Sequence, residues 1–228
     1  MKPLALVTGV GPGTGAAIAR RFSDGGYRVA MLARDADRLA ALAAEIPDSL
    51  AVPCDVSDPA ALQAAIERIG APKVVVHNAV GGAFGAFADI DPAVLERNFQ
   101  VNVMALLHLA RLTTPAMIEA GEGALIVTGN TSALRGRANF AGFAPTKAAQ
   151  RILAESIARD VGPKGVHVAY LVIDAVIDLA WTRARYKDAP DDFFIQPADI
   201  AGEVFHLAHQ PRTAWSFLSE VRPFRETW

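Results

Sequence analysis

The sequence predicts a doubly wound α/β fold, with one parallel sheet covered by helices on both faces, in a single domain spanning residues 1–228. Three observations carry this prediction. Short apolar β-rich runs alternate with longer stretches of helical periodicity. Crossovers of this length join parallel strands in a right-handed sense and place helices on both faces. The first apolar run also enters a helix through a glycine-dense turn.

The expected elements follow this alternation along the chain. Strands are expected from Leu4 and at 27–33, 49–54, 73–77, 124–128 and 166–173, with a last edge strand at 215–218. Helices are expected at 16–22, 35–46, 57–69, from 91, and at 97–120, 143–161 and 197–209. Ser57-Asp58-Pro59 is typical of a capped helix start, and Gly121 of a helix end. The charged, irregular segment 178–192 is either a substrate lid or a mobile surface loop.

Composition argues against several function classes. The formal net charge is only −2, whereas a nucleic-acid-binding protein is usually basic. No apolar run is expected to be long enough to span a bilayer, and Met1-Lys2-Pro3 leaves no room for a signal peptide. Cys54 is the only cysteine, and His206 and His209 lack a third ligand nearby, so no metal site is expected. We therefore expect a cytoplasmic protein with a small-molecule substrate and neither nucleic-acid nor membrane partners.

The glycine-dense turn is the first candidate site. Glycine lets the chain turn sharply and lets a pyrophosphate approach the backbone. The unpaired N–H groups at the following helix start, together with the helix dipole, favour an anion there. An ordinary tight turn is the alternative, but the position between a strand and a helix favours a dinucleotide site.

A series of motifs resembles the short-chain dehydrogenase/reductase family over nearly the whole chain. The matching motifs are Thr8-Gly9-x-x-x-Gly13-x-Gly15, Asp55-Val56, His77-Asn78-Ala79, Asn102 and Lys147. The resemblance implies that the cofactor pyrophosphate lies at Gly9, Gly13, Thr14 and Gly15, and that the adenine lies at Asp55 and Val56. It also implies that Asn78 and Ala79 line the ribose side and that Ile177 lies near the nicotinamide carboxamide. It also implies that Lys147 holds the nicotinamide ribose and that Asn102 holds a water in the proton relay.

The departures from the family pattern fall on its catalytic residues. Phe143 stands where the resemblance expects the tyrosine that protonates the substrate oxygen, and Asn130 stands at the serine. Loss of a general acid typically reduces the rate by ~10²–10⁴-fold. Thr131 and Ser132 are candidates to orient a substrate oxygen or to cap the turn after the fifth strand. Tyr186, beside several cations, is either a displaced phenol or a surface tyrosine.

The end of the second strand distinguishes the two nicotinamide cofactors. Ala33 stands where NAD-preferring relatives carry an acid, and Arg34 stands where NADP-preferring relatives carry a base. A guanidinium suits the 2′-phosphate through charge-assisted bonds. Asp35 either pairs with Arg34 or caps the next helix. The prediction is NADP(H), with NAD(H) less favoured.

Together these residues predict an NADP(H)-dependent oxidoreductase with an altered catalytic set, acting on a small carbonyl, imine or activated alkene. A catalytically weak or inactive dinucleotide-binding sensor or scaffold is the alternative. Five aromatic residues are expected to line the substrate pocket: Phe84, Phe87, Phe143, Trp181 and Phe193. The long helices 97–120 and 143–161 match those that form a four-helix interface in relatives, which implies a homodimer or homotetramer.

Overall fold

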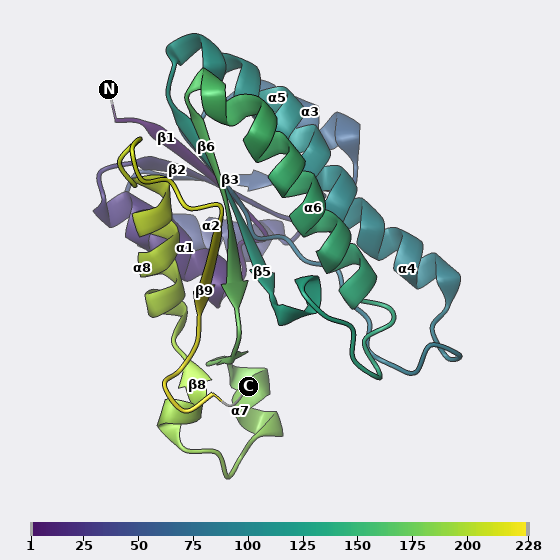
Figure 1. The fold of residues 1–228 in the computed structure, drawn as a ribbon. Helices are drawn as coiled ribbons and strands as arrows, with labels where there is room; N and C mark the ends of the chain where they lie inside the picture. The colour runs from purple at the N-terminus through teal and green to yellow at the C-terminus, as the bar shows by residue number, and fades with distance from the viewer. Residues whose placement is uncertain (1, 227–228) are drawn as a thin grey trace.

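A seven-stranded, all-parallel sheet forms the centre of the computed structural model, which describes residues 2–226 (Figure 1). The strand order β3-β2-β1-β4-β5-β6-β9 reverses direction at β1 and β4, which confirms the doubly wound fold. The strands are β1 (Leu4–Thr8), β2 (Arg28–Ala33), β3 (Ser49–Pro53), β4 (Val74–His77), β5 (Gly123–Asn130), β6 (Val166–Ile173) and β9 (Leu218–Val221).

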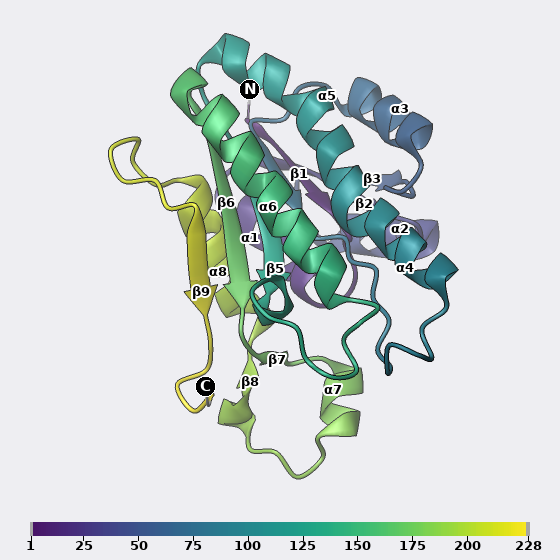
Figure 2. The same cartoon turned by 45° about the vertical axis from the view of Figure 1, so that its right-hand side comes forward.

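Helices cover both faces of this sheet (Figures 1 and 2). One face packs against α1 (Thr14–Asp24), α2 (Ala36–Glu45) and α8 (Pro197–Ala208), and the other against α3 (Pro59–Ile69), α5 (Ala105–Ala120) and α6 (Ala144–Val161). Successive strand side chains alternate between the two cores, so that Leu6 and Val7 are both fully buried on opposite faces. This burial on both faces explains why the strands are almost entirely apolar.

Aspartates begin several of these helices, as the sequence predicts. The Asp58 carboxylate accepts hydrogen bonds from the N–H groups of Ala60 and Ala61 at the start of α3, where Pro59 follows. Asp35 caps α2 by accepting from Arg38 N. Gly121 ends α5 in the left-handed conformation that favours glycine.

The long helix before β5 differs from its expected form. It begins at Pro92 rather than Arg97, because Asp91 caps α4 (Pro92–Phe99), and it continues through a π-helical turn at Gln100–Met104 into α5. A π turn contains one extra residue and shifts the helical register at that point. Asn102 lies within this turn, so the irregularity coincides with a predicted site residue.

The same helix corrects the expectation about membrane spans. Taken by length and composition alone, Pro92–Ala120 is long and apolar enough to cross a bilayer, with a mean hydropathy of 1.3. However, 44% of that apolar window is buried inside the protein, and core helices pass the same test. Leu106 and Leu109 are fully buried in the core beneath α5, so packing accounts for the apolar character.

The C-terminal strand was misplaced by the sequence prediction. The edge strand is β9 at Leu218–Val221, where it pairs with β6, and not 215–218. Trp215 instead stacks its ring on His167, with the ring centroids 4.9 Å apart, and donates to the Gln210 carbonyl. His209 is exposed, and its ring packs against Phe205 and contacts the Tyr27 hydroxyl.

Segment 178–192 contains a short helix, α7 (Ala180–Arg185), between two strands that form a separate small sheet, β7 (Val176–Ile177) and β8 (Phe194–Ile195). Figure 1 shows this unit below the carboxyl ends of β5 and β6. The Arg183 guanidinium pairs with Asp178 and Asp191, and Gln196 donates to Asp178. These contacts hold the segment as a defined structure at the ligand edge of the sheet.

Candidate functional site

The glycine turn after β1 is closed tightly by backbone contacts. Gly9 has φ +68°, and a Cβ there would lie 2.5 Å from the Ala79 Cα. A Cβ on Gly15 would lie 2.6 Å from the Gly9 carbonyl oxygen. Real Cβ atoms do not approach backbone so closely, so both positions require glycine. The turn then leads into Thr14, the first residue of α1, and no side chain caps the N–H groups at this helix start.

An apolar side chain lies over this turn. The Leu179 side chain approaches Gly13 so closely that it would collide with any Cβ there. Gly11, by contrast, has open space around it. Because the contact to Gly13 is made by a side chain rather than by backbone, a rotamer change of Leu179 is sufficient to expose the turn. Sequence reasoning missed Leu179, which shares no motif with the glycines it covers.

The end of β2 presents an available cation. Arg34 is exposed, and among residues 2–226 no carboxylate forms an ion pair with it. Asp35 does not compete for Arg34, because its carboxylate caps α2 and pairs with Arg38 at 2.8 Å. The pKa of Asp55 is lowered chiefly by hydrogen bonds from Ser57, with a smaller contribution from the Arg34 charge. The adjacent Val56 is buried.

A polar network joins the carboxyl ends of the central strands. The Thr8 hydroxyl accepts from the backbone N–H groups of Asn78 and Ala79, each at 3.2 Å. The Asn78 amide donates to the Gly9 carbonyl at 3.1 Å and accepts from the Thr128 hydroxyl at 3.1 Å. Asn78 therefore connects the ends of β1, β4 and β5 and fixes the wall on the ribose side of the predicted cleft.

Asn102 is fully buried, and its side chain is satisfied within the protein. The amide exchanges two bonds with the Gly81 backbone, at 2.7 and 2.9 Å, and donates to Thr146 at 2.8 Å. Its backbone carbonyl accepts from the Gln150 side chain at 2.7 Å. The π turn thus fixes the loop that follows β4 against the start of α6.

Lys147 lies beneath this network and is only 2% exposed. Its ammonium donates to the Thr128 carbonyl at 3.1 Å and to the Gln150 side-chain oxygen. Burial without a carboxylate partner lowers the pKa of Lys147 to about 7. The third ammonium hydrogen has no protein acceptor among the described residues.

Gln150 was not identified from the sequence, although it lies one helical turn after Lys147, on the same face of α6. It joins the ammonium of Lys147 to the carbonyl of Asn102, and the Tyr170 hydroxyl also donates to it at 3.4 Å. Tyr170 is fully buried, as expected for a mid-strand core residue, so its phenol has no access to a ligand.

Phe143 and Asn130 lie at the positions where the resemblance expects the proton-donating and substrate-orienting side chains. Phe143 precedes α6 and is 5% exposed. The Asn130 side-chain oxygen caps a short 3₁₀ turn (Thr131–Ala133) by accepting from Ser132 N at 3.1 Å. Ser132 is buried within that turn and Thr131 is partly buried. The Asn130 side chain is therefore engaged in capping the turn.

Two of the five predicted pocket aromatics come together, and Phe140 joins them. The rings of Phe84 and Phe143 lie 5.4 Å apart, and Phe140 lies 5.2 Å from Phe84. We call Phe84, Phe140 and Phe143 the aromatic cluster. Phe87 is 85% exposed and Trp181 is 66% exposed, while Phe193 packs against Tyr186 and Phe194.

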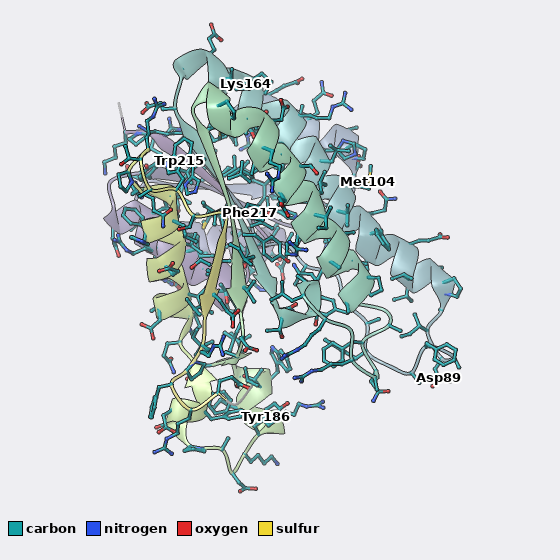
Figure 3. The ribbon with its side chains drawn as sticks, viewed as in Figure 1. Asp89, Met104, Lys164, Tyr186, Trp215 and Phe217 are labelled. Atoms are coloured by element: carbon teal, nitrogen blue, oxygen red, sulfur yellow. The ribbon has the colours of Figure 1, made fainter. Side chains whose placement is uncertain are left out.

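Tyr186 lies at the end of α7, in the unit below the sheet (Figure 3). Its side chain is 38% exposed, and its ring packs against Phe193 and near Arg185. A cavity of about 510 Å³ lies between the β5–α6 loop and the first turns of α6, where Arg135, Arg137, Phe140 and Arg151 are among the lining residues. Neither Phe143 nor Lys147 is among the residues that line this cavity.

The comparisons with known proteins agree with this arrangement. The sequence model of the short chain dehydrogenase family matches residues 3–181. The D-erythrulose reductase of Gallus gallus is 32% identical over 165 residues, or 72% of this chain and 67% of that protein. The 7alpha-hydroxysteroid dehydrogenase of Escherichia coli (strain K12) is 29% identical over 227 residues, or 92% of this chain and 88% of that protein.

Solved structures extend the match to the whole fold. The crystal structure of a metagenomic short-chain oxidoreductase in complex with NADP superposes with a TM-score of 0.84, at 31% identity, over 97% of both chains. With the family model covering most of its length, this chain belongs to the short-chain dehydrogenase/reductase family of NAD(P)-dependent oxidoreductases.

Proposed function

We propose that this protein is an NADP(H)-dependent oxidoreductase with an altered catalytic set, in which Phe143 and Asn130 replace the tyrosine and serine of its relatives. The observation that carries the cofactor preference is the Arg34 guanidinium, which is exposed at the end of β2 while Asp35 is engaged with Arg38. A free guanidinium at this edge suits a 2′-phosphate and has no comparable partner in NAD(H).

The remaining cofactor contacts follow from the same edge of the sheet. Gly9, Gly13 and Gly15, with Thr14 at the helix start, would hold the pyrophosphate. Asp55 and Val56 would contact the adenine, Asn78 and Ala79 the ribose side, and Ile177 the carboxamide. Lys147 would give its third hydrogen to the nicotinamide ribose. When bound, the nicotinamide supplies or accepts a hydride at a small substrate beside Phe143 and Asn130.

Substitution of Arg34 tests this proposal. Arg34→Ala should weaken NADPH binding by about tenfold to a hundredfold, since a hydrogen bond to a charged group contributes ~1.5–3 kcal/mol, and should leave NADH binding nearly unchanged. Arg38→Ala is the matched control, because that guanidinium is already paired with Asp35 at 2.8 Å. Calorimetric titration with both cofactors measures the ratio. Equal losses of affinity for NADPH and NADH would show that Arg34 does not contact the 2′-phosphate.

A dinucleotide-binding sensor without turnover is the second candidate function, and the absence of a phenol at Phe143 favours it. It predicts tight NADPH binding with no NADPH consumption on a broad panel of carbonyl and imine substrates. Turnover of any of these substrates would exclude it.

The proposal includes a closed homodimer or homotetramer built on α5 and α6. These helices lie side by side on one face of the sheet (Figure 2), and the exposed Ile152 lies on α6. Light scattering measures the assembly, and a monomer in dilute solution would contradict it. The proposal also includes the cytoplasmic location expected from the sequence, which cell fractionation checks.

A further inference from the structure

Phe143, whose side chain is a hydrocarbon, occupies the position where the resemblance expects the residue that donates a proton to the substrate. Phe143 contacts the loop after β4, where its ring lies against Gly82, and it packs with Phe84. Phenylalanine has no exchangeable hydrogen. Asn130 retains amide hydrogens, but an amide donates a hydrogen bond without releasing its proton near neutral pH. The two side chains nearest the expected substrate oxygen therefore supply no general acid.

The route by which a proton would be replaced is also closed. In the proton relay that the resemblance implies, Asn102 holds a water. Here the Asn102 carbonyl accepts from the Gln150 amide at 2.7 Å, and the other end of that amide accepts from Lys147. A glutamine side chain fills the place between carbonyl and ammonium and cannot pass a proton as a water can. Lys147 is sealed from solvent on this side, at 2% exposure.

The surface beside this position favours an organic cation. Phe84, Phe140 and Phe143 present three neighbouring rings, and Phe84 is 66% exposed, so its face is open to a ligand. An aromatic face attracts a cation through its quadrupole. Phe140 also lines the cavity of Arg135, Arg137 and Arg151, so the ring face that is open to a cation is that of Phe84.

We propose that the substrate pair of this site is an iminium cation and its amine, a reaction that needs no proton from the protein. The inference rests on the proposed function, with NADPH as the reductant. A hydride leaves the nicotinamide and forms a C–H bond at the iminium carbon, while the π electrons of the C=N bond become the nitrogen lone pair. The products are a neutral amine and NADP⁺, and no proton is transferred. A ketone, in contrast, would leave an alkoxide that neither Phe143 nor Asn130 could protonate.

The first experiment compares two bicyclic substrates of similar size with the wild-type protein and NADPH. N-methyl dihydroisoquinolinium is a permanent iminium cation, and tetralone is a neutral ketone. After subtraction of the protein-free rate, the iminium should be reduced at least ~10²-fold faster, the lower bound of what a general acid contributes to carbonyl reduction. The iminium rate should be the same in light and heavy water, because no proton moves in the hydride-transfer step.

The second experiment measures binding alone and so does not depend on turnover. N,N-dimethyl tetrahydroisoquinolinium has the same shape and charge but no C=N bond to reduce. Phe84→Leu should weaken its binding about two- to five-fold, the size of an exposed cation–π contact of ~0.5–1 kcal/mol. Phe87→Leu is the matched control, because Phe87 lies in the same loop, is 85% exposed and is outside the aromatic cluster. That control should leave the affinity unchanged.

Each outcome has a definite meaning. Tetralone reduction as fast as iminium reduction, a solvent isotope effect on the iminium rate, or equal binding to wild type and Phe84→Leu would each overturn the inference. If tetralone is reduced and Tyr186→Phe abolishes that reduction, α7 supplies the missing acid. NADPH binding is measured first: its absence refutes the proposed function, whereas NADPH binding without iminium reduction refutes only the iminium inference.

Discussion

The two halves of the carboxyl edge of the sheet differ in the exposure of their polar groups. In the half formed by β1, β2 and α1, polar groups face outward: Arg34 is exposed, and the N–H groups at the start of α1 follow a glycine turn. In the half formed by β5, β6 and α6, polar groups are satisfied internally. There Lys147, Gln150 and Asn102 hydrogen-bond one another and are almost completely buried.

This contrast separates binding from chemistry. The first half contains the groups that we propose to recognise an anionic cofactor, and its turn depends on backbone geometry that only glycine permits. The second half retains the buried lysine and asparagine of the family pattern but has no acid at Phe143. A site can therefore keep its cofactor affinity while its proton-transfer groups change, since the two tasks belong to different strands.

The largest expected effect comes from restoring the acid in the second half. Phe143→Tyr should raise NADPH-dependent reduction of a reactive diketone by ~10²–10⁴-fold, the usual contribution of a general acid. Asn130→Ser in the same chain should raise the rate further, and more than additively, because both hydroxyls would act on one oxygen. NADPH consumption measures both variants.

Phe140→Tyr provides the control for that gain. It adds the same hydroxyl to a neighbouring ring of the aromatic cluster, three residues before the position that the Tyr-x-x-x-Lys spacing assigns to the tyrosine. Unchanged diketone reduction in Phe143→Tyr, with NADPH binding retained, would show that the second half has been remodelled beyond the loss of one hydroxyl.

Substitution of Gly9 tests the backbone requirement of the first half. Gly9→Ala should destabilise the protein by ~2–3 kcal/mol, because the new Cβ meets the backbone of Ala79 and φ is +68°. Gly11→Ala, in the same turn but with open space around it, should change the free energy of unfolding by less than ~1 kcal/mol. Urea unfolding of the two variants measures both changes in the free energy of unfolding. Similar losses in both variants would contradict the steric explanation.

The buried ammonium of the second half predicts a pH dependence of stability. The pKa of Lys147 falls from 10.5 to about 7 on folding because of burial. Between these values the unfolded chain binds a proton that the folded chain does not, so raising the pH favours folding. Relative to Lys147→Met, the wild type should gain stability from pH 7 upward, by at most ~1.4 kcal/mol per pH unit. Below pH 7 the difference between the two should be constant.

Denaturant unfolding of both proteins across that range measures the slope. A difference between wild type and Lys147→Met that does not change with pH would show that Lys147 remains charged throughout. In the first half, by comparison, the cation is the exposed Arg34, which is not transferred out of water on folding.

Much of this protein could be predicted from its sequence alone. Strand and helix order follow from local periodicity, and the caps at Asp35 and Asp58 follow from short-range hydrogen bonding, so neighbouring residues suffice to specify them. The positions of the glycine turn before α1 and of the exposed Arg34 after β2 follow for the same reason, because they depend only on adjacent elements. The absence of a phenol at Phe143 was also visible, since it required only the spacing to Lys147.

Tertiary structure alone decided the rest. The link from Lys147 through Gln150 to Asn102 joins α6 to a π turn 48 residues earlier, and no local pattern marks it. Leu179 reaches Gly13 across more than half of the chain, and Phe140 meets Phe84 through the pairing of two loops. The position of β9 was likewise determined by its register on β6 rather than by its own composition. Such contacts depend on packing between distant segments, because burial selects which polar groups must find one another.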